Sequence, residues 1–215
     1  MALKLFLAFA LTVYASLGFS LSPPPELNYT ELARLTNKEL IVHSRAIPKR
    51  PWPEITIFAV IDVLPVEAAA VFSNYQDQKK YIPDLLKSDP IKKIAENEII
   101  VDFEMHFPWP LANSRYSTRN VFKVLENNGY EISWHMVESD SLIDTRGAIQ
   151  FIPYGTKTLL IYRSLIYPRS MLAPIFSSRV KASMSRMVQA IVTYTEETKK
   201  QNPEKIQRLI NSLPK

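Results

Sequence analysis

The chain has 215 residues, and its 26 Lys and Arg outnumber its 21 Asp and Glu, for a formal net charge of +5. Charged residues make up 22% of the chain, close to the average of globular proteins, which indicates a folded protein. The lack of cysteine excludes a disulfide framework, an Fe–S cluster, a thiolate zinc site and a cysteine nucleophile. The four glycines form neither a P-loop nor a dinucleotide-binding motif, which excludes the usual glycine-rich routes to nucleotide chemistry.

The first 20 residues have the pattern of an export signal. Lys4 gives a short basic start, an apolar run extends from Leu5 to Val13, and small residues end the segment. The run is shorter than the about 20 apolar residues that span a bilayer. We therefore expect residues 1–20 to be a signal peptide cleaved after Gly18 or Ser20. The protein is then exported, to the periplasm if the host is bacterial and otherwise out of the cell; an uncleaved membrane anchor is the alternative.

The elements of the first half are predicted from apolar and β-branched patterns. Three consecutive prolines make residues 21–26 a stiff, extended spacer. The segments that follow are predicted as a helix over 26–35, strands over 41–45 and 55–63, and helices over 66–74 and 77–86.

The second half reads as an antiparallel meander. Residues 98–107 alternate between apolar and polar side chains, and Asn127-Asn128-Gly129 is a strong hairpin signal. The predicted strands cover 98–107, 115–125, 130–137, 143–152 and 156–167.

A long helix over 171–199 is the clearest element. Its apolar residues recur with the helical period: Leu172, Phe176, Val180, Met184, Met187, Val188, Ile191 and Tyr194. Residues 201–215 are expected to be a polar C-terminal tail with a short helix. The order of elements predicts one α+β domain over 27–200, in which a curved antiparallel sheet grips the long helix.

Three segments carry a resemblance to a known family. Residues 41–45 resemble its opening strand, residues 63–75 its first-helix motif, and residues 107–113 its proline-containing loop. In this order they resemble the START domain and its polyketide-cyclase-like relatives, the helix-grip or SRPBCC superfamily, over about residues 27–197. The resemblance implies a helix-grip fold with a ligand cavity between the sheet and the last helix.

Two departures limit what the resemblance implies. Ser114-Arg115 stands where the family pattern has an Arg-Asp pair, and Tyr167-Pro168-Arg169-Ser170 replaces a glycine-rich turn. The identity of the relatives' ligands is therefore not carried over to this chain.

The residues offer no catalytic constellation. There is no GxSxG motif, and the three histidines form no convincing triad. His106 and His135 with Asp102 or Glu104 would suit a metal, but all four alternate with apolar residues, which favours a solvated outer face of the sheet. We expect neither a metal nor a cofactor.

Methionines and aromatic residues on the inner faces predict a deformable apolar cavity. An ordinary filled core is the alternative. The candidate ligand-binding residues on strands are Phe103, Met105, Phe107, Tyr116, Trp134, Met136 and Tyr162, with Arg119 and Arg146 as polar partners. Those on the long helix are Phe176, Val180, Ser183, Met184, Met187 and Ile191.

The sequence thus favours an exported START-like domain that binds a lipid or other apolar small molecule. Transfer of this molecule, in addition to binding, is left open. Arg179, Lys181 and Arg186 on the long helix suggest peripheral contact with an anionic membrane, or else a solvated helix border. One rival is a cyclase-type enzyme, which requires a buried titratable group with a shifted pKa. The other is an interaction module with a filled core. Nucleic acid is disfavoured as a partner because the remaining basic residues are scattered.

Overall fold

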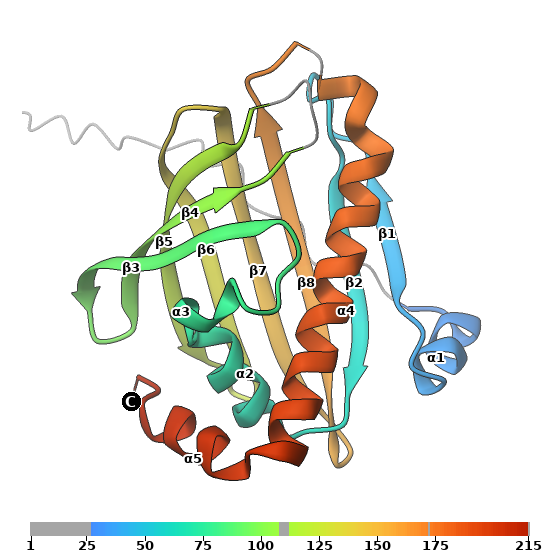
Figure 1. The fold of residues 1–215 in the computed structure, drawn as a ribbon. Helices are drawn as coiled ribbons and strands as arrows, with labels where there is room; N and C mark the ends of the chain where they lie inside the picture. The colour runs from blue at the N-terminus through green and yellow to red at the C-terminus, as the bar shows by residue number, and fades with distance from the viewer. Residues whose placement is uncertain (1–26, 108–111, 172, 215) are drawn as a thin grey trace, which may run out of the picture.

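The computed structural model describes residues 27–107, 112–171 and 173–214 (Figure 1). The strands are β1 (Ile41–Arg45), β2 (Glu54–Ile61), β3 (Leu85–Ala95), β4 (Glu98–Met105), β5 (Ser114–Val124), β6 (Tyr130–Ser139), β7 (Leu142–Tyr154) and β8 (Lys157–Pro168). The helices are α1 (Tyr29–Thr36), α2 (Pro65–Ser73), α3 (Tyr75–Gln78), α4 (Ser177–Gln201) and α5 (Pro203–Asn211), with a short 3-10 helix, η1 (Ala173–Phe176), before α4. The predicted signal peptide and spacer lie outside the described residues, as do residues 108–111 of the predicted loop.

All eight strands form one antiparallel sheet in the order β1-β2-β8-β7-β6-β5-β4-β3. The sheet curves around α4, which runs across it, while α2, α3 and α5 gather at the end where α4 finishes (Figure 1). The predicted α+β helix-grip fold is therefore confirmed.

Strand β2 is buried on both faces along its whole length. Ile55 and Ile57 point into the main core beneath α4, whereas Phe58 and Val60 join a second apolar cluster with Leu35 of α1. Helix α1 thus covers the outer face of the sheet at β2, which explains why this strand shows no polar alternation.

A buried carboxylate joins α2 to the far end of α4. Glu67, 5% exposed, accepts a hydrogen bond from the backbone N–H of Leu64 at 2.9 Å and so caps the first turn of α2. The same carboxylate forms an ion pair with Lys199. Because the buried carboxylate would be costly without these partners, the pair holds the C-terminal end of α4 on the domain.

The predicted helix over 77–86 is wrong, and a strand was missed. Helix α3 ends at Gln78, and β3 begins at Leu85 after Pro83 and Asp84, which has a positive φ of 63°. Strand β3 is an exposed edge strand with three register shifts, and Pro90 lies within it. Such irregularity protects sheet edges from aggregation but removes the alternation by which a strand is recognised.

The long helix begins later than predicted. The segment at 173–176 is the 3-10 helix η1, and α4 starts at Ser177. Pro174 suits this break because it cannot donate the backbone hydrogen bond that a continuing helix interior requires. Among the described residues, none of the helices combines the length and apolarity needed to cross a membrane.

The C-terminal segment contains the expected short helix, α5, which packs on the domain. Asn202 caps α5, and Ile206 is buried at 2% exposure. The ammonium of Lys205 lies 2.7 Å from the carboxylate of Asp77 in α3 and 2.9 Å from the hydroxyl of Tyr194 on α4. Most residues of α5 are polar, so the narrow apolar face that packs against α2 and α4 was not recognised in the sequence.

Replacing Ile206 with Ala therefore destabilises the domain by about 2–4 kcal/mol, because it empties a packed site. Urea unfolding of the full chain measures the change. Arg208→Ala, on the exposed side of the same helix, is the control and stays within about 0.5 kcal/mol of the parent. Equal stabilities for the two variants would show that α5 is dispensable.

Candidate ligand-binding site

The N-terminal half of α4 stands away from the sheet and leaves a cavity of about 580 Å³, the outer cavity. Its walls are mostly apolar and come from α4, from the inner faces of β4, β5, β7 and β8, and from the loop before β2. The described lining residues are Trp52, Pro83, Asp84, Met105, His106, Phe107, Ser114, Tyr116, Leu142, Thr145, Tyr162, Ile166, Phe176, Arg179, Val180, Ala182, Ser183, Met184, Arg186 and Met187.

A smaller cavity of about 100 Å³, the inner cavity, lies deeper, toward α2 and α3. It adjoins the outer cavity, because Met105, Tyr116 and Met187 are among the residues that line both. Its remaining wall is formed by residues such as Gln78 and Asn120. Together the two cavities lead from the surface to the centre of the domain.

The structure brings most of the sequence-predicted candidates to these cavities. The outer cavity is lined by Met105, Phe107, Tyr116, Tyr162, Phe176, Val180, Ser183, Met184 and Met187. Phe103 and Trp134 line the inner cavity.

Four candidates do not line either cavity. Ile191 is fully buried in the filled part of the core, and Met136 is half-buried further along β6. Arg119 and Arg146 lie on the opposite face of the sheet, since their neighbours Asn120 and Thr145 point inward. Arg119 forms an ion pair with Glu98, and Arg146 one with Asp144. Successive side chains of a strand point to opposite faces of the sheet. Arg119 and Arg146 therefore do not line the cavity, contrary to the expectation that they hold a ligand head group there.

The position of Trp134 depends on a glycine in the neighbouring strand. Trp134 of β6 pairs with Gly147 of β7, and a Cβ atom on Gly147 would collide with the indole ring and the carbonyl oxygen of Arg163. The indole also packs on Tyr162, with ring centroids 5.5 Å apart. Gly147 therefore allows a large aromatic side chain to form the floor of the inner cavity.

The electrostatic character changes along the cavities. The opening of the outer cavity is lined by exposed charged or titratable residues: Asp84, His106, Arg179 and Arg186. Among them, the side chains of Asp84 and Arg186 form an ion pair at 3.7 Å. Deeper, burial raises the pKa of Tyr116 and brings the pKa of Tyr162 to about 12. These phenols therefore remain neutral hydrogen-bond donors at physiological pH.

Sequence reasoning missed several residues of the site. The indole Nε1 of Trp52 donates a 2.6 Å hydrogen bond to the carbonyl oxygen of Ala173, which anchors η1 at the rim of the outer cavity. The sequence feature that could have indicated Trp52 is its position between two prolines in a predicted loop. Asn120 and Thr145 were also missed, although both are polar residues at inward positions of otherwise apolar strands.

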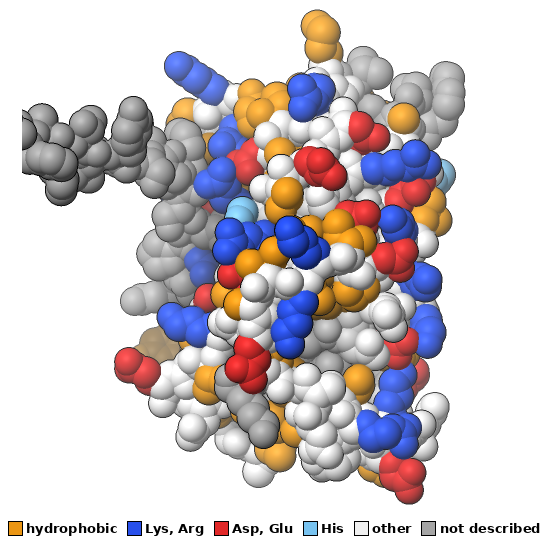
Figure 2. Space-filling view, turned by 90° about the vertical axis from the view of Figure 1, so that its left-hand side faces the viewer, with side chains coloured by type: hydrophobic (Ala, Val, Ile, Leu, Met, Phe, Trp, Pro, Cys, Tyr) orange, Lys and Arg blue, Asp and Glu red, His pale blue; other side chains and the backbone are white. Residues whose placement is uncertain are grey.

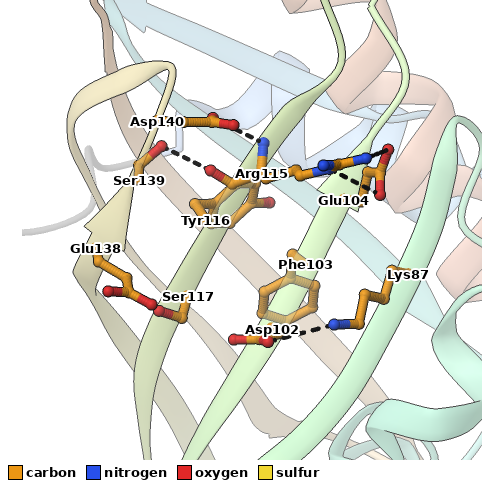
Figure 3. A pocket seen from close by; sticks show the side chains of 10 residues that line it. All are labelled: Lys87, Asp102, Phe103, Glu104, Arg115, Tyr116, Ser117, Glu138, Ser139 and Asp140. Atoms are coloured by element: carbon orange, nitrogen blue, oxygen red, sulfur yellow. Dashed lines mark hydrogen bonds and ion pairs between the residues drawn. The ribbon is translucent and has the colours of Figure 1, made fainter.

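A second, more open cleft lies on the outer face of β4, β5 and the β6–β7 turn (Figure 3). Two ion pairs lie in it: Lys87 lies 3.3 Å from Asp102, and Arg115 lies 3.2 Å from Glu104. Hydrogen bonds from Asn113 and Arg115 hold the pKa of Glu104 below its usual value. The carboxyl thus stays ionised and is no proton donor at neutral pH.

The surrounding surface shows acidic, basic and apolar side chains interspersed (Figure 2). Among residues 27–107, 112–171 and 173–214, no group of three His, Asp or Glu side chains is placed to hold a metal. His106 lies 3.1 Å from Asn113, and His135 has its pKa lowered by burial and by the nearby Arg119 and Arg146.

The architecture is shared with solved lipid-transfer domains. A STAR-related lipid transfer protein from Xanthomonas axonopodis matches 73% of this chain and 93% of its own, with a TM-score of 0.67 and 13% identity. Human StAR-related lipid transfer protein 5 matches 74% of this chain and 82% of its own, with a TM-score of 0.65 and 12% identity. The Zhui aromatase/cyclase from Streptomyces sp. R1128 matches 75% and 98%, with a TM-score of 0.59 and 10% identity.

The sequence itself matches no protein-family model, and no curated protein is significantly similar to it. At these identities the likeness is one of architecture. The chain has the helix-grip fold of START-related lipid-transfer domains and of a polyketide aromatase/cyclase, in agreement with the resemblance carried by its motifs.

An aromatic ring introduced at Ser183 tests whether the outer cavity is empty space. We expect Ser183→Phe to keep the free energy of unfolding within about 1 kcal/mol of the parent, because the ring enters a void. Val188→Phe, about one turn away in the filled core, is the control and loses about 1–3 kcal/mol by overpacking. Equal losses in chemical denaturation would mean that the cavity is filled.

Proposed function

We propose that the protein is exported and binds a lipid or other apolar small molecule in the outer cavity, as a carrier. The observation that carries the proposal is the apolar cavity of about 580 Å³ between α4 and the sheet. This volume lies within the roughly 300–1,000 Å³ range of small-molecule sites. Two structurally similar proteins are STAR-related lipid transfer proteins, which supports the proposal.

The energetics suit a carrier. Burying a chain of about 16 carbons contributes on the order of 10 kcal/mol at about 0.8 kcal/mol per methylene. A bilayer provides a similar gain in free energy. A ligand can therefore exchange between the cavity and the membrane when its free energy of burial is similar in both. Binding rather than catalysis is favoured because Asp84 and His106 lie exposed at the opening of the outer cavity, and the described lining of the inner cavity contains no carboxylate, histidine or lysine to act as acid or base.

The rim of the outer cavity has the character of a membrane-contacting surface. Met171 is 96% exposed and Ile175 is 73% exposed, just before α4. Arg179 and Arg186 line the opening, and Lys181 is exposed between them. Apolar side chains flanked by basic ones favour the surface of an anionic bilayer, so we propose that the protein docks there by this rim.

Native mass spectrometry of the protein purified after expression of the full chain tests export and ligand binding together. We expect a mass that corresponds to cleavage after residue 18 or 20, and an apolar ligand in defined stoichiometry that organic solvent extracts. An uncleaved chain would contradict export by a cleaved signal. An empty protein that also takes up no fluorescent apolar probe would contradict the binding function.

Charge reversal at the rim tests docking. We expect Arg179→Glu/Arg186→Glu to weaken binding to vesicles containing anionic lipid by at least about tenfold, with the difference shrinking at high salt. The matched control is Lys200→Glu/Arg208→Glu, which makes the same charge change at the far end of α4 and on α5. Unchanged vesicle binding by the first variant, measured by sedimentation, would show that this rim is not the docking surface.

A further inference from the structure

Polar side chains gather around the inner cavity, deep in the apolar interior. Thr118 is 1% exposed, Ser164 is 2% exposed, and Asn120 and Thr145 are each 4% exposed. All four line the inner cavity together with Tyr116. Buried polar groups cost free energy unless they find hydrogen-bond partners, so their presence around one void requires an explanation.

Some polar groups of these residues form hydrogen bonds within the protein, and others form none with the described residues. The amide nitrogen of Asn120 donates to the carbonyl oxygen and to the hydroxyl of Thr118, at 3.0 and 2.8 Å. Its Oδ1 oxygen accepts no hydrogen bond from any described residue, and the hydroxyls of Tyr116 and Thr145 likewise form none with that part of the chain. The hydroxyls of Ser164 and Tyr162, which also line the inner cavity, interact with each other. One acceptor, on Asn120, and two hydroxyls, of Tyr116 and Thr145, therefore remain available there.

Gln78, which also lines the inner cavity, does not add to these available groups. Gln78 donates from its amide nitrogen to the carbonyl oxygen of Phe72 at 2.9 Å and accepts from the hydroxyl of Ser88 at 3.3 Å. Gln78 is thus occupied in holding α3 against β3. It is a structural residue of the wall.

The charges around a ligand further restrict its chemistry. The described residues of the inner cavity include no Asp, Glu, His, Lys or Arg, whereas Asp84, Arg179 and Arg186 lie at the opening of the outer cavity. An anion at the inner end would be buried without a counter-charge, which is strongly unfavourable. A neutral oxygen meets the available groups without that cost.

We infer that the ligand is an uncharged, largely apolar molecule that enters with a hydroxyl or carbonyl oxygen first and places it in the inner cavity. A hydroxyl there donates to Oδ1 of Asn120 and accepts from Thr145 or Tyr116, whereas a carbonyl only accepts. Asn120 and Thr145 then determine specificity for this oxygen, while the outer cavity contributes apolar contact. The inference rests on the proposed binding function and narrows it to one chemical class of ligand.

The test compares matched probes that share one apolar skeleton. Hexadecanol and hexadecane, and a steroid alcohol and its deoxy hydrocarbon, each compete with a fluorescent apolar probe for the protein. The quantity measured is the ratio of the affinities for alcohol and hydrocarbon. In Asn120→Leu/Thr145→Val we expect this ratio to fall at least about tenfold, through loss of affinity for the alcohol, while hydrocarbon binding is kept.

Thr193→Val is the matched control, because it makes the same change as Thr145→Val at an exposed position of α4 that lines neither cavity, and it leaves the ratio unchanged. Thr145→Val alone keeps the side-chain shape and gives a smaller fall in the same direction should the double variant fail to fold. An unchanged ratio in folded inner-cavity variants overturns the inference but leaves the binding function standing; the polar groups then hold only water. Failure of every probe to bind the parent protein overturns the binding function, and the inference with it.

Discussion

The seating of α4 across the curved sheet is the constraint on which the rest of the structure depends. Toward its C-terminal end the helix is packed tightly, with Val188, Ile191 and Thr195 fully buried and Lys199 paired with Glu67 of α2. At the other end η1 is held by the hydrogen bond from Trp52. A straight helix on a curved sheet packs closely along only part of its length, so the apolar face of its N-terminal half borders a cavity instead of a core.

Polarity along this cavity is graded, and the proposed function depends on that gradient. Charged and exposed apolar residues surround the opening, methionine and aromatic side chains line the middle, and neutral hydrogen-bonding groups line the inner end. An apolar molecule is driven in by burial, whereas the few polar groups decide its orientation. The tyrosines belong to this neutral end, since burial keeps Tyr116 and Tyr162 protonated.

Much of the fold was predictable because its signals are local. Strands with clean alternation, the hairpin at Asn127-Asn128-Gly129 and the apolar stripe of α4 were all recognised. The failures were β3, which was missed, and the packing of α5 on the domain, since only a short helix in a polar tail was predicted there. Strand β3 is an edge strand broken by bulges, so it has no regular inner face. Helix α5 presents mostly polar residues and is held by Ile206 and by the ion pair of Lys205 with Asp77, far away in the sequence.

The sequence by itself determined the type of fold and, through period-two alternation, most of the side chains that face inward. Arg119 and Arg146 could have been excluded on the same basis, because Tyr116 and Thr145, at odd separations from them, face inward. Only the tertiary structure decided that a void exists and that Asn120 and Thr145 meet in it. The distance between a helix and a curved sheet is set by packing at both ends of the helix, and no local pattern of residues records it.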